Sequence, residues 1–246
     1  MPDLSFEVTG VEAPTFAAAP LLMFKLRLAN TPAAESIHTI VLRCQIQIEA
    51  TRRRYNGAEQ ERLLDLFGEP ERWRTTLRAM LWTHVSVAVS PFTGSTDVDL
   101  PVPCTYDFNV AAAKYFYGLE DGDVPLTFLF SGTIFYAADD GALQVSQISW
   151  SKEARFRLPM SVWQEMMEHY YPNSAWLRLG KDVFDRLYLY KVRRGLPTWE
   201  QALESLLAGH EGESGPAAPL GPEGAAAAWL EGVRAASMRD EKVSRP

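Results

Sequence analysis

The sequence predicts a mainly β fold: an antiparallel β-sandwich of about eight strands with a small C-terminal helical cap and a disordered tail. Through most of residues 1–158, apolar and polar side chains alternate with a period of two, which is typical of strands buried on one face. At Pro159 the apolar residues change to helical spacing, and from His210 the chain becomes rich in Gly, Pro, Ala and Glu. We therefore divide the chain into a sandwich over residues 1–158, a helical cap packed on it over 159–208 and a tail over 209–246.

Eight segments carry the strand pattern, and turn-forming residues separate them. The third has the best-defined register, because a slip of one residue would expose the five apolar side chains that alternate from Ile40 to Ile48. The fifth contains two prolines, which cannot donate hydrogen bonds to a sheet, so we expect an edge or an irregular strand there. A barrel is the alternative architecture for such a set. The segments are residues 4–11, 22–28, 40–48, 81–89, 97–104, 125–137, 143–150 and 153–158.

Helical signals interrupt and follow the strands. Residues 58–67 are rich in good helix formers and are followed by a glycine. Ser161 and Thr198 each open a capping box with a glutamine three residues later, which predicts that a helix begins at each. The first of these helices is expected to reach Tyr171. Apolar residues at helical spacing predict another helix over residues 181–194.

Aromatic residues gather between Pro103 and Tyr136. This stretch holds nine of the 21 Phe and Tyr residues of the chain. Its residue pattern predicts a strand end, a short helical turn, a turn at Asp121-Gly122 and a long apolar strand. We interpret it as the central packing element of the sandwich.

Charge and cysteine content limit the classes of partner. The formal net charge of −7 argues against a nucleic-acid partner, because phosphate contacts need a basic surface. The one basic run, Arg52-Arg53-Arg54, follows a strand and is interpreted as a solvated strand end or an edge guard. Cys44 and Cys104 are too far apart for a CxxC site and too few for a disulfide scaffold, so we expect buried free thiols.

Targeting signals are not evident in the sequence. The N-terminal residues lack the basic and apolar regions of a signal peptide. No apolar run approaches the roughly 18 residues that a membrane span needs. We expect a cytoplasmic protein without a membrane partner.

Histidines offer little for metal binding or catalysis. Glu165 and His169 lie one helical turn apart, but two ligands fall short of the three that a catalytic zinc site takes from the protein. His84 alternates with Trp82 and Ser86 along a strand, so we interpret all three as lying on the outer face of that strand.

Acidic and hydroxyl residues also fit structural roles. Three acidic clusters, at Asp97/Asp99, residues 120–123 and residues 139–141, lack the spacing of an EF-hand and fit turns. Ser131 lacks the strand–elbow–helix context of an exposed nucleophile. We assign no catalytic, cofactor-binding or metal-binding residue and expect no cofactor, although a carboxylate pair for glycoside hydrolysis stays open.

The positions of the tryptophans say more about packing and partner binding than the histidines and acidic residues do. Four indoles, Trp150, Trp163, Trp176 and Trp199, lie near predicted strand–helix junctions, and we expect them to join the cap helices to the sandwich. In the tail, residues 225–236 can form an Ala-rich helix that is too short to be stable alone. It would carry three apolar residues on one face, so we assign a partner-binding role to Trp229, Leu230 and Val233.

Stretches that together cover most of residues 3–208 resemble an uncharacterised actinobacterial family, a domain of unknown function. They are PDLSFEVTGVEA, KYFYGLEDGDVPLTFLFSGTIFY, and LPMSVWQEMMEHYYPNSAWLRL followed by LPTWEQALESLL. Members of that family are often encoded beside genes for nickel–iron uptake hydrogenases and their maturation factors. The resemblance therefore implies an accessory role in assembly or maturation of a nickel–iron hydrogenase, and it supplies no catalytic residues.

The residues favour binding over metal handling within that role. A nickel carrier would be expected to show a His-rich tract or a Cys pair, and an iron–sulfur carrier more than two cysteines. We expect a non-catalytic adaptor whose partner is a hydrogenase subunit or maturation factor. The alternative is a carbohydrate-binding or hydrolytic β-sandwich module with its site on a sheet face.

Overall fold

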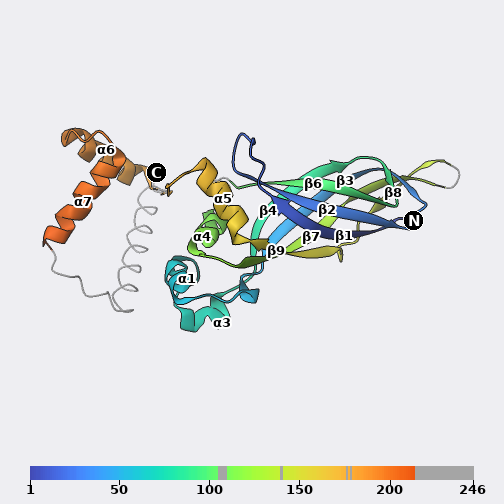
Figure 1. The fold of residues 1–246 in the computed structure, drawn as a ribbon, viewed down its shortest axis with the longest axis horizontal. Helices are drawn as coiled ribbons and strands as arrows, with labels where there is room; N and C mark the ends of the chain where they lie inside the picture. Colours follow the sequence, from blue (N-terminus) through green and yellow to red (C-terminus); the bar gives the residue numbers. More distant parts are fainter. Residues whose placement is uncertain (105–109, 139–140, 176, 178, 214–246) are drawn as a thin grey trace, which may run out of the picture. The chain divides into compact units, whose positions relative to one another are not determined.

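The computed structural model describes residues 1–104, 110–138, 141–175, 177 and 179–213. The chain forms two compact units, Met1–Trp176 and Leu177–Pro246. The first unit contains two antiparallel sheets packed face to face, with short helices gathered at one end of them (Figure 1). This arrangement confirms the mainly β fold and the antiparallel pairing that the alternating pattern predicts.

Three strands form the smaller sheet, in the order β1-β2-β6. Their bounds are Asp3–Glu12 for β1, Leu21–Thr31 for β2 and Ser95–Pro103 for β6. Within the described residues, β6 pairs with β2 alone, so it is an edge strand. Its prolines Pro101 and Pro103 predict that position, because an edge does not require their missing N–H groups.

The larger sheet has the order β4-β3-β7-β8, with β5 also paired to β3 and β9 also paired to β7. β7 is therefore central, which fits the interpretation of the aromatic stretch as a packing element. β8 and β9 follow each other along the same edge of β7. The bounds are Ser36–Ile48 for β3, Met80–Val89 for β4, Phe92–Thr93 for β5, Asp123–Ala137 for β7, Leu143–Gln147 for β8 and Glu153–Pro159 for β9.

The core lies between the inner faces of the two sheets. Phe24 of β2 meets Phe128 of β7 edge to face at 5.1 Å, and Phe6 of β1 stacks on Phe130 at 4.1 Å between ring centroids. The five alternating apolar residues of β3 are buried, as the predicted register requires. They are Ile40, Leu42, Cys44, Ile46 and Ile48.

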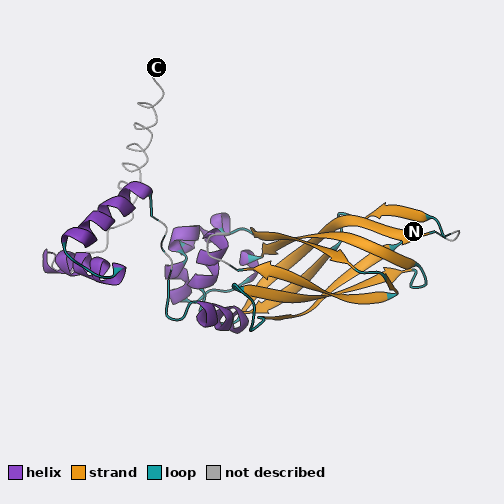
Figure 2. Ribbon diagram, turned by 90° about the horizontal axis from the view of Figure 1, so that it is seen from above, coloured by secondary structure: helices purple, strands orange, loops and turns teal. Residues whose placement is uncertain are grey.

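Helices close one end of this sandwich (Figures 1 and 2). Most connect β3 to β4, α4 connects β6 to β7, and α5 follows β9. α5 buries Met160, Trp163, Met166 and Met167, so it belongs to the core of the first unit. The bounds are Ala50–Arg52 for η1, Gly57–Arg62 for α1, Leu64–Phe67 for α2, Pro70–Arg72 for η2, Trp73–Thr76 for α3, Val110–Gly118 for α4 and Met160–Tyr170 for α5.

The second unit contains α6, Lys181–Arg193, and α7, Trp199–Glu213. The two helices contact each other through Trp199, whose ring centroid lies 5.2 Å from that of Phe184. Thr198 caps α7, because its Oγ1 accepts a hydrogen bond from the Gln201 N–H at 3.2 Å, as the predicted capping box requires. The cap that we predict over residues 159–208 spans both units, and its packing on the sandwich stays a prediction.

The structure corrects the predicted face of Trp82. Trp82 is 5% exposed, whereas His84 is exposed on the outer face. The pairing of β3 with β4 shifts by one residue between Ile46 and Gln47, which marks a β-bulge beside Trp82. Because the bulge breaks the alternation, Trp82 turns inward and its ring lies 4.9 Å from that of Phe116.

Two further details differ from the sequence prediction. α5 begins at Met160 with Pro159 as its N-cap and without a side-chain cap, so the capping box predicted at Ser161 is wrong. β5, with two residues, is too short for its alternation to be recognised.

Candidate functional site

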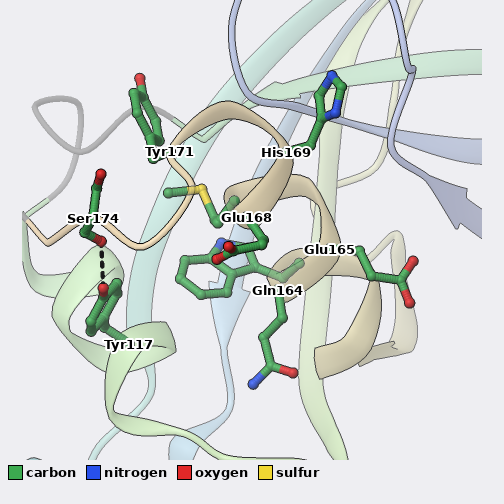
Figure 3. Close-up of a pocket in the computed structure, with 9 residues that line it drawn as sticks. Tyr117, Gln164, Glu165, Glu168, His169, Tyr171 and Ser174 are labelled. Atoms are coloured by element: carbon green, nitrogen blue, oxygen red, sulfur yellow. Dashed lines mark hydrogen bonds between the residues drawn. The ribbon is translucent and has the colours of Figure 1, made fainter.

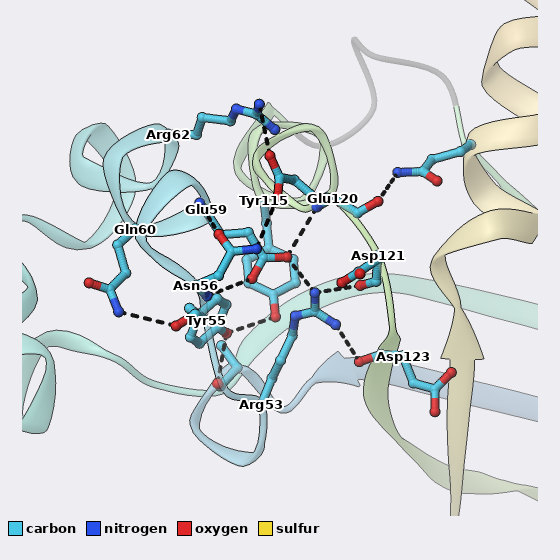
Figure 4. A network of polar contacts seen from close by, with 12 residues as sticks. Arg53, Tyr55, Asn56, Glu59, Gln60, Arg62, Tyr115, Glu120, Asp121 and Asp123 are labelled. Atoms are coloured by element: carbon cyan, nitrogen blue, oxygen red, sulfur yellow. Dashed lines mark hydrogen bonds and ion pairs between the residues drawn. The ribbon is translucent and has the colours of Figure 1, made fainter.

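A buried ion pair holds the helical end of the sandwich together (Figure 4). Nη2 of Arg53 lies 2.5 Å from Oε1 of Glu59, and the two side chains are only 7% and 2% exposed. The guanidinium also donates to the carbonyl oxygens of Asp121 at 2.6 Å and Asp123 at 2.8 Å. Arg53 therefore ties η1 and α1 to the turn that enters β7.

Glu59 has its own set of donors. Its carboxylate accepts hydrogen bonds from the backbone N–H groups of Glu120 and Asn56, each at 3.1 Å, and Asn56 completes a capping box at the start of α1. Burial alone would raise the pKa of Glu59. The Glu120 N–H, the Arg53 guanidinium and the Asn56 N–H outweigh burial and hold that pKa below its ordinary value.

Two tyrosine hydroxyls form hydrogen bonds beside this pair, and their pKa values are raised. The hydroxyls of Tyr55 and Tyr115 are 2.8 Å apart, and the Tyr55 hydroxyl also donates to the Ala50 carbonyl. Burial raises the pKa of Tyr55 to about 12 and raises that of Tyr115 as well. Both hydroxyls stay protonated at neutral pH, so neither tyrosine supplies a phenolate base.

This network corrects the interpretation of Arg52-Arg53-Arg54. Arg52 and Arg54 are exposed, as a solvated strand end requires, but Arg53 is buried and paired. An arginine has no sequence signal for burial when its partner lies six residues away in the next helix. The Asn56–Glu59 capping box, which sequence reasoning missed, marks the start of α1 but does not show that Arg53 is buried.

An open groove of about 630 Å³ runs beside α5 and the C-terminal end of α4 (Figure 3). Trp163 forms part of its wall and stacks on Phe116 at 5.3 Å. Tyr117 closes another side, and its hydroxyl donates to the Ser174 carbonyl at 2.7 Å. The remaining lining residues are Gln164, Glu165, Met167, Glu168, His169 and Tyr171.

The groove combines an aromatic wall with acidic side chains. Its aromatic wall accepts apolar groups, and Glu165 and Glu168 supply negative charge. Figure 3 shows Glu165 and His169 pointing in different directions, so these residues do not converge on one ligand. Within the described part of the chain, no group of three or more His, Cys, Asp or Glu residues is placed to hold a metal ion.

The acidic clusters and the thiols have structural surroundings. Asp97 and Asp99 lie within β6 and pair with Arg27 and Lys25, each at 2.9 Å, so the turn predicted for this cluster is wrong. Gly122 follows Asp121 with a φ of +72°, which confirms the predicted turn. Cys44 is buried, as predicted, whereas Cys104 is only partly buried. Burial raises the pKa of both thiols to about 12, so both free cysteines stay neutral.

The helical pair α6–α7 exposes most of its large apolar side chains. Among the residues of these helices up to Gly209, Ala202 is the one buried residue. The ring of Trp199 contacts Phe184 and Tyr188, and Lys191 lies over it at 5.6 Å, so one aromatic cluster orders the pair. The exposed residues, here called the α6–α7 surface, are Val183, Phe184, Tyr188, Leu189, Val192, Leu203, Leu206 and Leu207.

The four tryptophans expected at strand–helix junctions have different environments. Trp163 is buried, and it stacks on Phe116 of α4, so its cited contact joins two helices rather than a helix and a strand. Trp150 is 90% exposed in the turn between β8 and β9, so its predicted packing role is wrong. Trp199 packs within the second unit, and Trp176 lies outside the described residues.

The predicted tail site also lies outside the described residues. It comprises Trp229, Leu230 and Val233. The turn predicted at Asp139-Asp140 falls on residues that are likewise not described. In the described part of the chain, no helix has the length and apolar character needed to cross a membrane.

Comparison with known proteins identifies a family whose function is unknown. A family model described as "Family of unknown function (DUF6084)" matches residues 1–215. No curated protein matches the chain.

Solved structures offer only distant likenesses. The CARDB domain of the PF1109 protein from Pyrococcus furiosus, solved with two metal ions, is 11% identical, with 64% of this chain and 92% of that chain covered and a TM-score of 0.25. IrmA from Escherichia coli is 12% identical, with 74% and 99% covered and a TM-score of 0.27. At these scores the likenesses carry no argument about function.

Proposed function

We propose, from the premise that this chain belongs to the DUF6084 family of unknown function, that the protein is a non-catalytic accessory protein whose α6–α7 surface binds a protein partner. The observation that carries the proposal is the exposure of eight large apolar side chains on two short helices. Exposed apolar surface of this density is typical of protein-binding sites, because water contact with it is unfavourable until a partner covers it.

Aromatic residues make this surface suited to an anchor contact. Phe184 is 45% exposed and Tyr188 is 51% exposed, although both rings contact Trp199. Rings that are already ordered lose little side-chain entropy on binding, and aromatic side chains dominate the free energy of many interfaces.

The partner class comes from the sequence resemblance. Members of the family that the sequence resembles are often encoded beside nickel–iron uptake hydrogenase genes, so the proposed partner is a hydrogenase subunit or a maturation factor. We place this contact in the cytoplasm, where a reducing environment keeps the free thiols Cys44 and Cys104 reduced. The tail residues Trp229, Leu230 and Val233 are proposed as a second contact with the same partner.

The test is affinity purification of the tagged full-length chain from its native host, followed by mass spectrometry. We expect hydrogenase subunits or maturation factors with the unchanged protein and their loss with Phe184→Ser/Tyr188→Ser. Val41→Ser is the matched control, because Val41 is 47% exposed on β3 and is not part of the proposed surface. Recovery of neither protein class, or equal recovery with the double variant, contradicts the proposal.

A truncation separates the tail from the helices. Removing residues 214–246 should leave the fold intact and weaken partner recovery without abolishing it. Unchanged recovery would remove the tail from the proposal. The hydrolytic or carbohydrate-binding alternative gains no support from the groove, because the groove lies on helices rather than on a sheet face.

A further inference from the structure

We infer that two copies of this chain pair edge to edge through β8, forming one continuous sheet across a two-fold axis. The inference is independent of the proposed function. It begins with the edge of β7 along which β8 and β9 follow each other. Within the described residues, no strand pairs with the other side of β8, which lies at the end of the sandwich away from the helices (Figure 1).

The hydrogen bonds at the two ends of β8 show which of its backbone groups face outward. The N–H of Ala138 donates to the Ala142 carbonyl, and the N–H of Ile148 donates to the Gly132 carbonyl. Both bonds continue the register in which Phe135 lies opposite Val145. Because narrow and wide pairs alternate in an antiparallel ladder, alternate residues of β8 direct their N–H and C=O groups away from β7. These residues are Leu143, Val145 and Gln147.

The same three residues carry their side chains on the outer face of the sheet. Leu143 is 62% exposed and Val145 is 56% exposed. Ten consecutive residues, Ala142–Ser151, include no charged residue and no proline. Exposed strand edges in natural proteins usually carry a charge, a proline or a bulge that prevents pairing, and β8 itself carries none of these.

The β9 half of the same edge is protected. The bond from the Phe130 N–H to the Lys152 carbonyl sets the ladder so that Glu153, Arg155 and Arg157 hold the outward positions. All three are charged and exposed. Lys152 also pairs with Asp3 of β1 at 2.6 Å, so β1 lies against this part of the edge. The contrast confines the unprotected edge to β8.

Two features favour a second copy as the occupant. The first is the absence of charged side chains along Ala142–Ser151, because two copies that each carry a formal net charge of −7 meet with least repulsion at an uncharged edge. The second is register. Antiparallel pairing about Val145 puts Val145 opposite its equivalent and Leu143 opposite Gln147 of the other copy. Every outward N–H and C=O of the three residues then has a partner, and the two-fold contact closes without further growth.

The test is sedimentation equilibrium of the full-length chain over a wide range of concentration. We expect a dimer of twice the 27.6 kDa chain mass, with association that strengthens as added salt screens the net charge. Val145→Lys should weaken dimerisation at least about tenfold, because it puts two like charges opposite each other. Val41→Lys is the control on the same outer face, two strands in from the edge, and should leave dimerisation unchanged.

A second variant removes only the pairing group. Val145→Pro deletes an N–H that points away from β7, so the intramolecular ladder keeps its bonds while the dimer loses one from each copy. We expect a folded monomer, checked by circular dichroism. A chain that stays monomeric at every concentration overturns the inference. So does a dimer that Val145→Lys and Val145→Pro leave intact, or a β8 edge that binds an extended peptide of another protein instead.

Discussion

Helices α5 and α6 are both amphipathic, yet they contribute to different properties of the molecule. α5 buries four apolar side chains in the core of the first unit, whereas α6 buries none. Burial of an apolar side chain contributes to the free energy of folding, while an exposed one remains available for a contact with another protein. We therefore expect substitutions in α5 to change stability and substitutions in α6 to change binding.

The largest expected effect comes from the polar network that fixes the turn preceding β7, next to α5. Glu59→Gln should lower the free energy of unfolding by about 3–5 kcal/mol, because it leaves the Arg53 guanidinium charged and unpaired in a buried site. Urea unfolding followed by circular dichroism measures this. Arg62→Gln removes an exposed partner of Glu120 and should cost under about 1 kcal/mol. Equal effects of the two substitutions would show that burial of the pair is unimportant.

The comparison of the two helices can be tested with a matched pair of aromatic truncations. Trp163→Ala in α5 should cost about 3–5 kcal/mol, because it opens a cavity beside Phe116. Phe184→Ala in α6 should change the unfolding of the first unit by less than about 0.5 kcal/mol. Thermal unfolding of both variants under one condition provides the measurement. A large loss with Phe184→Ala would mean that α6 contributes to the core.

A pH series sharpens the role of Glu59. Its pKa is lower in the folded state, so the folded protein binds fewer protons than the unfolded chain over the range between the two values. The stabilisation is fully present above the ordinary glutamate pKa and is lost as the pH falls through the lowered one. Acid titration of unfolding should therefore show a smaller loss for Glu59→Gln than for the unchanged protein. Parallel curves would contradict this origin of the acid sensitivity.

The smallest effect concerns the loop between β1 and β2. The Tyr170 hydroxyl at the end of α5 donates to the Ala17 carbonyl at 2.7 Å. Tyr170→Phe should cost about 0.5–1.5 kcal/mol and increase hydrogen exchange in residues 13–20. Tyr188→Phe in α6 is the control and should leave exchange in that loop unchanged. An unaltered loop in the first variant would show that this bond does not hold it.

The sequence was most informative where a period and a buried face coincide. The alternating residues of β3 predict its register, and the prolines of β6 predict its edge position. Trp82 was placed on the wrong face because a single inserted residue reverses the alternation beyond it. The alternation of apolar and polar residues does not reveal where a bulge lies.

The candidate sites were less predictable, because they depend on contacts between distant segments. In the sequence, Arg53 cannot be told apart from an exposed arginine. Its burial becomes evident only in the structure, where it donates hydrogen bonds to the turn at residues 121–123. Trp150 and Trp163 both lie near predicted junctions, yet one is 90% exposed and the other 5%. Helical spacing predicts α6 but does not reveal whether its apolar residues meet a core or remain exposed.

The most direct test of the central claim is amide hydrogen exchange of the protein alone and in complex with the partner that it co-purifies with. If the α6–α7 surface binds that partner, exchange should slow by at least about tenfold in Lys181–Arg193 and Trp199–Glu213 and stay unchanged in β3 and β7. Protection confined to the groove beside α5 or to the sheets, with α6 and α7 exchanging as before, would contradict the account.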